Sequence, residues 1–235
     1  MLAVAAAVLA GQLSVGWHND WLDAERDRTA QRGDKPLVGS DLRRATVGVS
    51  AATALLACVP LSFLSGWRAG TSHVVAVLLA WAYNARLKST VWSWAPYAAS
   101  FALLVSFVSL GGRGHPAPPW WLVVAAALLG VGAHMANVVP DLAADAATGV
   151  RGLPHRLGRT RSVAAATALL LTASAVVAFG PGHPGWTSIG LPLAAAVVGA
   201  GLVAYRRGRE DLLFRASLVV ALVDVAMLVS RGRQL

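Results

Sequence analysis

Apolar runs of close to twenty residues recur along the entire chain, and this feature restricts the possible folds more than any other. An apolar α-helix of about 20 residues crosses about 30 Å of hydrocarbon. The sequence therefore predicts an all-α, polytopic membrane helix bundle with about eight transmembrane helices. The predicted spans cover residues 2 to 17, 45 to 66, 71 to 86, 93 to 111, 119 to 139, 162 to 180, 187 to 205 and 212 to 230.

The composition agrees with a membrane bundle. Of the 235 residues, 56% are hydrophobic and only 13% are charged, whereas charged residues make up about 25% of a soluble domain. The formal net charge of +9 would favour a nucleic-acid partner only if the basic residues formed one face of a soluble domain. They lie instead in short segments between the apolar runs. We therefore expect a single transmembrane domain over residues 1 to 235, with the lipid bilayer around it and no nucleic acid.

The distribution of lysine and arginine orients this bundle, because short loops rich in these residues stay in the cytoplasm. One set of alternate loops carries only Arg68, Arg113, Arg231 and Arg233, and Arg215 lies near the start of the last span. We therefore expect a multi-pass protein of the plasma or inner membrane, with the polar segments 18 to 44 and 140 to 161 in the cytoplasm. The other set of loops carries fifteen basic residues: Arg26, Arg28, Arg32, Lys35, Arg43, Arg44, Arg86, Lys88, Arg151, Arg156, Arg159, Arg161, Arg206, Arg207 and Arg209.

Three aspartates form a ladder just after the first span. Asp20, Asp23 and Asp27 are separated by three and four residues, so their carboxylates lie on one face if this segment is helical. Like charges at this spacing destabilise an isolated helix, and a divalent cation relieves the repulsion. Because Mg²⁺ binds one or two carboxylates together with phosphate oxygens and water, the ladder predicts a magnesium site for a phosphate-bearing substrate.

A second ladder lies in the other long cytoplasmic segment. Asp141 and Asp145 are four residues apart, with alanines between them that let another helix or a ligand approach closely. Two ladders that face each other could hold magnesium ions around one diphosphate. The basic residues that follow each ladder are candidates to neutralise phosphate oxygens: Arg26, Arg28, Arg32, Arg151 and Arg156.

Each ladder also has a purely structural interpretation. A segment with scattered aspartate and arginine is often only solvated surface, and Asp141 is well placed to cap a helix after Pro140. Two ladders on the same side of one membrane are much rarer by chance than either alone, which favours the metal site.

The motif NDxxDxxxD, from Asn19 to Asp27, and the motif DxxxD, from Asp141 to Asp145, resemble those of the UbiA superfamily of intramembrane prenyltransferases. The segment from Thr148 to Gly158, which ends in RLG, is also similar to that family, and the resemblance extends over residues 1 to 230. Members of the family commonly have nine helices. The resemblance implies that this sequence starts at the second of them, so that the first family helix is missing from it.

The resemblance implies an enzyme in which Mg²⁺ joins the two ladders to an isoprenyl diphosphate, while the prenyl tail occupies an apolar tunnel among the helices. The implied metal ligands are Asp20, Asp23, Asp27, Asp141 and Asp145. The implied catalytic residues are Asp20, Asp23, Asp145 and Lys88.

The family also has a tyrosine and a lysine that contact the diphosphate, often as YxxxK. Here Tyr83 and Lys88 are five residues apart, so Asn84 or Arg86 is an alternative to Tyr83. Without the resemblance, these residues are equally typical of an anchor at the membrane interface. The implied substrate-binding residues are Asn19, Arg28, Tyr83, Asn84, Arg86, Lys88 and Arg151.

Together these features predict a Mg²⁺-dependent prenyltransferase. It would move a polyprenyl group from an isoprenyl diphosphate to a lipophilic or aromatic acceptor, with the quinone-precursor type preferred, and release diphosphate. His134 and Asn137 are candidates to contact this acceptor, or they form a polar pair within the bundle. Aromatic side chains near the polar ends are candidates to shield an allylic cation, or they are interfacial residues: Trp17, Trp21, Trp81, Tyr83 and Trp94.

Three alternatives remain at the level of the sequence. A terpene cyclase of the same family uses the same diphosphate chemistry without an acceptor. A non-catalytic relative would act only as a membrane partner. A transporter would place charges midway along its helices, and Asp224 is the candidate for such a charge.

Overall fold

The computed structural model describes residues 2–29, 35–39, 42–112, 114, 116–180, 189–209 and 211–231. Two 3₁₀ turns, η1 (Leu87–Ser89) and η2 (Val91–Ser93), join α4 to α5. The basic residues Arg32, Arg113 and Arg233 lie outside the described residues. The helices are α1 (Leu2–Thr29), α2 (Pro36–Gly39), α3 (Arg44–Phe63), α4 (Trp67–Ala85), α5 (Trp94–Leu110), α6 (Trp120–Val138), α7 (Leu142–Ala147), α8 (Leu153–Leu157), α9 (Arg159–Phe179), α10 (Gly190–Arg206) and α11 (Asp211–Arg231).

The predicted all-α fold is confirmed, and a long helix lies at each of the eight predicted spans. These helices are α1, α3, α4, α5, α6, α9, α10 and α11. Four helical segments of the described part combine the length and hydropathy of a membrane span, namely Arg44–Phe63, Val91–Leu110, Trp120–Val138 and Arg159–Phe179, and Gly190–Arg206 is a shorter apolar helix.

The first helix is longer than predicted, because α1 continues past residue 17 to Thr29. Residues 21 to 28, WLDAERDR, include leucine, alanine, glutamate and arginine, which all favour the helix. Arg26 and Arg28 lie in its last turn, where positive charge complements the helix dipole. The first acidic ladder is therefore helical, which is the condition under which its spacing places the three carboxylates on one face.

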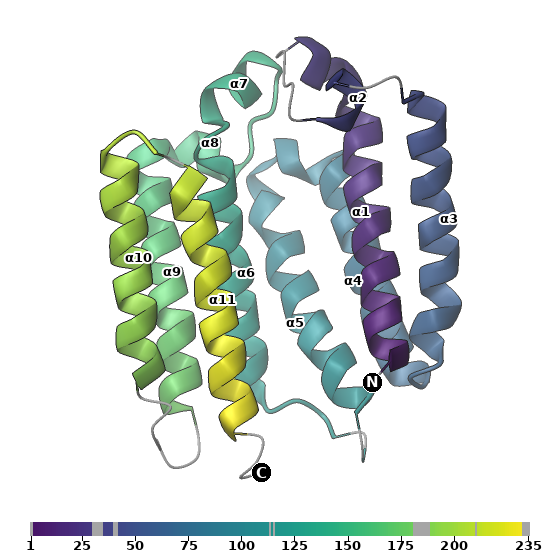
Figure 1. Ribbon diagram of the computed structural model, residues 1–235, viewed down its shortest axis with the longest axis vertical. Coiled ribbons are helices and arrows are strands. Elements are labelled where there is room, and N and C mark those ends of the chain that lie inside the picture. The colour runs from purple at the N-terminus through teal and green to yellow at the C-terminus, as the bar shows by residue number, and fades with distance from the viewer. Residues whose placement is uncertain are drawn as a thin grey trace.

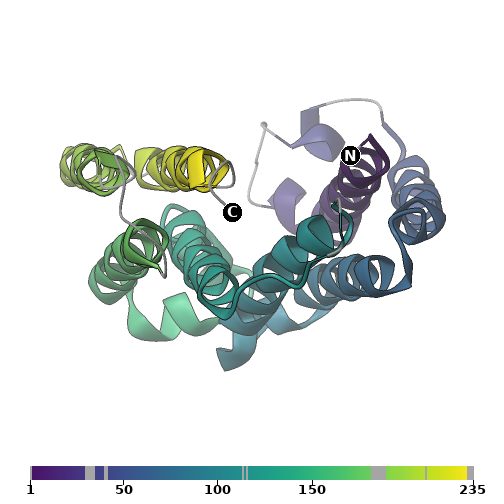
Figure 2. The ribbon, with the colours of Figure 1, turned by 90° about the horizontal axis from the view of Figure 1, so that it is seen from below.

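The long helices form an open ring (Figure 2). Neighbours pack in the order α3, α1, α4, α5, α6 and α9, and α10 and α11 pack against each other and against α9. The ring is open between α1 and α11, which face each other across the gap in Figure 2.

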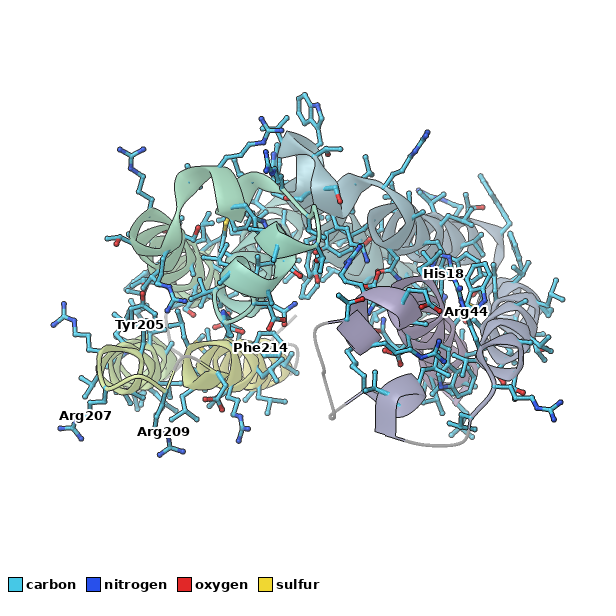
Figure 3. The ribbon with its side chains drawn as sticks, turned by 90° about the horizontal axis from the view of Figure 1, so that it is seen from above. His18, Arg44, Tyr205, Arg207, Arg209 and Phe214 are labelled. Atoms are coloured by element: carbon cyan, nitrogen blue, oxygen red, sulfur yellow. The ribbon has the colours of Figure 1, made fainter. Side chains whose placement is uncertain are left out.

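The polar connections gather at one end of the ring (Figure 1), where α2, α7 and α8 lie, whereas both chain termini lie at the opposite end. Figure 3 looks onto this polar end, and there Arg207 and Arg209 point outward from the connection between α10 and α11. The described basic loops that the sequence assigned to one side of the membrane thus share one end of the molecule.

Buried apolar clusters hold neighbouring helices of the ring together. Toward the end of the chain termini, Val4, Ala7, Ala69, Phe107 and Leu110 fill the space between α1, α4 and α5. A second cluster joins α6, α9 and α11, with six buried members: Met135, Ala136, Val139, Val163, Ala166 and Leu213.

Candidate functional site

A cavity of about 330 Å³ lies at the polar end of the ring. Five parts of the chain supply its polar lining: α1, the residue before α2, the end of α4 with η1, the start of α5, and the end of α6 with the segment that follows it. Their polar lining side chains are Asn19, Asp23, Arg26, Lys35, Tyr83, Asn84, Lys88, Tyr97, His134, Asn137, Asp141, Asp145 and His155.

Asp23 of the first ladder is held by two basic side chains. Lys88 Nζ donates to both carboxylate oxygens at 2.6 Å, and Arg26 Nη1 lies 3.2 Å from Asp23 Oδ1. Both Asp23 and Lys88 are buried. Loss of hydration on burial lowers the pKa of Lys88, while the charge of Asp23 opposes this shift. The pair joins α1 to η1, although the two residues are far apart in the sequence.

The other two members of the first ladder do not line the cavity. Asp20 accepts a hydrogen bond of 3.0 Å from Lys35 Nζ, and Lys35 is itself part of the lining. Asp27 is buried one turn beyond Asp23. Asp20 is therefore linked to the cavity through Lys35.

The second ladder reaches the same cavity from the other side. Asp141 and Asp145 both line it, and the Asp145 N–H donates to the Asp141 carbonyl at 2.8 Å as α7 begins. His155 Nε2 lies 3.4 Å from Asp145 Oδ2. The structure thus brings carboxylates of both ladders, about 120 residues apart in the sequence, to one cavity.

A buried serine connects the elements that carry these groups. Ser93 of η2 is fully buried, and its hydroxyl is 3.1 Å from His134 Nε2 on α6 and accepts from the Leu153 N–H at 2.9 Å. Gly152 lies against the same point, and a Cβ there would come within 2.6 Å of the Lys88 carbonyl oxygen. These contacts fix η1, with Lys88, against the segment that follows the second ladder.

An apolar cavity of about 190 Å³ adjoins the polar one. Val15, Tyr83, Asn84 and Tyr97 line both cavities, so the two meet at these four residues. The remaining lining comes from α1, α4 and α5: Gln12, His73, Ala76, Val77, Ala80, Pro96, Ser100, Phe101 and Leu104.

Aromatic rings mark the junction of the two cavities. The Tyr83 ring lies edge-on to Tyr97, with centroids 5.0 Å apart, and to His134, with centroids 5.6 Å apart. Tyr97 and His134 are 4.6 Å apart. A positive charge that develops at this junction would meet π faces rather than water.

The chemistry of the lining fits magnesium. Carboxylate oxygens from two sides of one cavity, with an amide side chain at Asn19, are the hard ligands that Mg²⁺ prefers. As the side chains stand, the described residues contain no group of three His, Cys, Asp or Glu close enough to hold an ion. Lys88, Lys35 and His155 instead lie against the carboxylates of Asp23, Asp20 and Asp145.

Apart from Asp20 and Asp27, which lie beside the lining, the structure separates the predicted site residues into two groups. Asn19, Asp23, Tyr83, Asn84, Lys88, Asp141 and Asp145 line the polar cavity. Arg28, Arg86 and Arg151 are exposed and do not line it. Arg28 donates to Glu25 at 2.9 Å, one turn away on α1.

Some lining residues carried no sequence signal of their own. Tyr97 and Lys35 belong to no motif, and His155 lies within the segment that ends in RLG without metal-ligand spacing. Of the predicted aromatic candidates, only Tyr83 lines the cavities, whereas Trp17, Trp21, Trp81 and Trp94 do not. Trp81 instead donates to Ser14 at 2.8 Å and stacks on His18 at 3.7 Å, which ties α4 to α1.

The sequence model of the UbiA prenyltransferase family matches residues 1–221. This match covers nearly the whole chain, and it includes both acidic ladders and Lys88. The chain therefore belongs to the UbiA prenyltransferase family, and its enzyme class is that of the prenyltransferases.

Solved structures agree with this assignment at the level of the fold. A UbiA homologue from Aeropyrum pernix K1 is similar with a TM-score of 0.78 and 21% identity, over 98% of this chain and 89% of that one. A UbiA homologue from Archaeoglobus fulgidus, bound to GPP and Mg²⁺, is similar with a TM-score of 0.69 and 17% identity, over 95% and 87% of the two chains. A digeranylgeranylglyceryl phosphate synthase is similar with a TM-score of 0.65 and 18% identity, over 97% and 84%. Comparison with curated proteins gives no match.

Proposed function

We propose that this protein transfers a prenyl group from an isoprenyl diphosphate to a lipophilic acceptor, with Mg²⁺ as cofactor and on the cytoplasmic side of the membrane. One observation carries the proposal: carboxylates of both acidic ladders and Lys88 line a single polar cavity, and an apolar cavity shares part of its lining. A diphosphate joined to a prenyl tail has the same division into a polar head and an apolar tail.

The ladder carboxylates are the groups that would hold magnesium, with Asp23, Asp141 and Asp145 in the lining and Asp20 and Asp27 beside it. Bound magnesium would stabilise the negative charge that develops on the diphosphate as it leaves. The described residues place no carboxylate in the apolar cavity, so the charged head is confined to the polar one.

Lys88 is the cation best placed to bind the diphosphate. Its ammonium is paired with Asp23 in a water-poor setting, and magnesium at Asp23 would free it to donate to phosphate oxygens. Because such a donor is already oriented before the C–O bond breaks, it stabilises the leaving group without reorganising solvent. Asn84 and Tyr83, at the junction of the cavities, would contact the oxygen nearest to the prenyl chain.

The junction is where the allylic carbon would lie. The rings of Tyr83, Tyr97 and His134 surround this position and would shield the developing cation from water. The acceptor would approach through the polar cavity, where Asn137 and His134 offer hydrogen bonds. A small aromatic acceptor of the quinone-precursor type fits this mixture of π faces and polar groups.

The test is to identify the product. Detergent-purified protein is incubated with an isoprenyl diphosphate, Mg²⁺ and a lipid extract, or with single aromatic acceptors such as 4-hydroxybenzoate or a naphthoate, and products are analysed by mass spectrometry. We expect a prenylated acceptor that forms only when both substrates are present. A cyclic or linear hydrocarbon formed without acceptor would instead identify a terpene cyclase. Absence of any product from every diphosphate would refute the proposal.

A further inference from the structure

The apolar cavity is a tunnel with an inner end. On α4 its lining runs from Asn84 and Tyr83, at the polar cavity, to His73, and on α5 it runs from Tyr97 to Leu104. Beyond this level the buried cluster of Val4, Ala7, Ala69, Phe107 and Leu110 fills the space between α1, α4 and α5. The tunnel therefore ends where packed side chains begin.

His73 forms the surface of this end. It is 1% exposed, and its ring stacks on Phe107, with centroids 4.4 Å apart and an angle of 14° between the planes. Phe107 belongs to the buried cluster, so the imidazole lies between the tunnel and the core. A Cβ on Gly11 of α1 would come within 3.3 Å of His73 Cε1 and Nε2, so the ring also reaches the opposite wall.

Hydrogen bonds hold the ring of His73 in this position. Ser62 Oγ donates to the Cys58 carbonyl at 2.6 Å and lies 2.8 Å from His73 Nδ1. Because the serine hydroxyl has only one proton, His73 Nδ1–H is the donor in the second bond. The imidazole is thus fixed from α3 behind it and from Phe107 below it.

The length of the tunnel sets the length of the tail that it can hold. The ten residues from Tyr83 to His73 on α4 correspond to about 15 Å, since a helix rises about 1.5 Å per residue. An extended chain advances about 1.2 Å per bond, so an isoprene unit of four bonds spans about 5 Å. Three units fill this distance.

From this geometry we propose that the tunnel accepts an isoprenyl tail of at most three units, as in geranyl or farnesyl diphosphate, and that His73 is the specificity-determining residue at its end. The inference rests on the proposed function, because it names the length of the tail of the same substrate.

The experiment compares kcat/KM for diphosphate release from geranyl, farnesyl, geranylgeranyl and octaprenyl diphosphates. For the wild-type protein we expect similar values for the first two and a fall of at least about tenfold at geranylgeranyl, because an apolar group that does not fit its pocket costs about 10-fold or more in kcat/KM. In His73→Ala the drop in kcat/KM should occur at a longer chain. The ratio of kcat/KM for geranylgeranyl diphosphate to that for farnesyl diphosphate should rise at least about tenfold.

Two further variants make the test specific. Ala76→Leu adds bulk to the tunnel wall one turn above His73, and it should reduce farnesyl use while geranyl use is retained. Val75→Ala is the matched control, because Val75 is on the same helix but 41% exposed and outside the lining, and it should leave the profile unchanged. These two variants and the wild-type profile test the proposal even if His73→Ala does not fold.

Three results would overturn the inference. Equal use of all four diphosphates by the wild type would mean that the tail leaves the tunnel sideways past Gln12, and the proposed function would stand. If neither His73→Ala nor Ala76→Leu changes the dependence of kcat/KM on chain length, His73 does not determine specificity. Absence of release from every diphosphate would refute the proposed function and, with it, this inference.

Discussion

Lys88 and Asp23 form the central contact of the site at the scale of single residues. Both are buried, and the ammonium donates to both carboxylate oxygens. Removing one member of a buried pair leaves the charge of the other without compensation. The pair therefore places a cation beside the carboxylate that we propose as a metal ligand before any substrate enters.

We predict that Lys88→Ala lowers kcat/KM for the isoprenyl diphosphate by about 10- to 100-fold, because a hydrogen bond to a charged group contributes about 1.5–3 kcal/mol. Lys88→Arg should restore part of this loss, since a guanidinium also binds phosphate oxygens. The measurement is diphosphate release at saturating Mg²⁺.

Arg86→Ala serves as the control for the Lys88 variants. Arg86 is exposed and outside the cavity lining, although it is only two residues from Lys88. A larger loss in Arg86→Ala than in Lys88→Ala would show that the diphosphate binds elsewhere.

At this scale, the spacing of the aspartates along the sequence made part of the site predictable. Which of the other predicted residues enter the cavity depends on tertiary packing. The helical spacing of Asp20, Asp23 and Asp27 predicted one face, and Asp23 does enter the cavity. The sequence could not indicate that Arg28 pairs with Glu25. Arg28 could equally have pointed into the cavity toward a phosphate oxygen, and spacing alone does not decide between the two directions. Tyr97 was not predicted, because its position depends on how α5 packs.

At the scale of elements, the close approach of α5 and α6 shapes the cavity. Gly130 of α6 lies against α5, and a Cβ there would come within 2.6 Å of the Tyr97 carbonyl oxygen and 2.9 Å of Phe101 Cγ. A backbone oxygen cannot move aside as a flexible side chain can. The absence of a side chain at Gly130 therefore permits this helix contact, which positions Tyr97 at the junction of the cavities.

We predict that Gly130→Ala destabilises the protein by about 1–3 kcal/mol, the usual cost of added bulk in a packed core. Gly199→Ala on α10 is the matched control, because a Cβ there has nothing within 4 Å. It should leave stability unchanged or raise it by up to about 1 kcal/mol, the difference in helix propensity. Thermal unfolding in detergent measures both, and equal midpoints for the two variants would contradict the helix contact.

The positions of the long helices could be predicted from the apolar runs, because each run must be long enough to cross the bilayer. The start of α3 at Arg44 and the end of α6 at Val138 differ from the predicted spans by only one residue. The extension of α1 to Thr29 was missed because it carries polar residues. Three tertiary hydrogen bonds stabilise this extension. Asp23 accepts from Lys88, Asp20 accepts from Lys35, and the Trp21 carbonyl accepts from Arg44.

At the scale of the whole molecule, the open ring has a polar end and an end that carries both termini. The exposed arginines of the α10–α11 connection lie at the same end as the polar cavity (Figure 3). From the excess of lysine and arginine at this end, we predict by the positive-inside rule that it faces the cytoplasm. The diphosphate would therefore come from the cytoplasm.

This orientation is tested with single cysteines. Cys58 is the only cysteine and is buried, so a Cys58→Ala background has no reactive thiol. We predict that a membrane-impermeant maleimide added to intact spheroplasts labels Leu64→Cys, at the α3–α4 connection, and does not label Ala147→Cys, at the end of α7. Both positions are exposed. The reverse pattern would place the site on the outer side of the membrane.

The central claim is that carboxylates of both ladders hold the magnesium that supports diphosphate release. The most direct measurement is the rate of diphosphate release from farnesyl or geranyl diphosphate as a function of Mg²⁺ concentration, for the wild type, Asp23→Asn, Asp145→Asn and the exposed control Glu25→Gln. We predict that release by the wild type stops in a chelator and falls by at least about 100-fold in each aspartate variant, while Glu25→Gln stays within about twofold. Wild-type rates and wild-type Mg²⁺ dependence in either aspartate variant would contradict the claim.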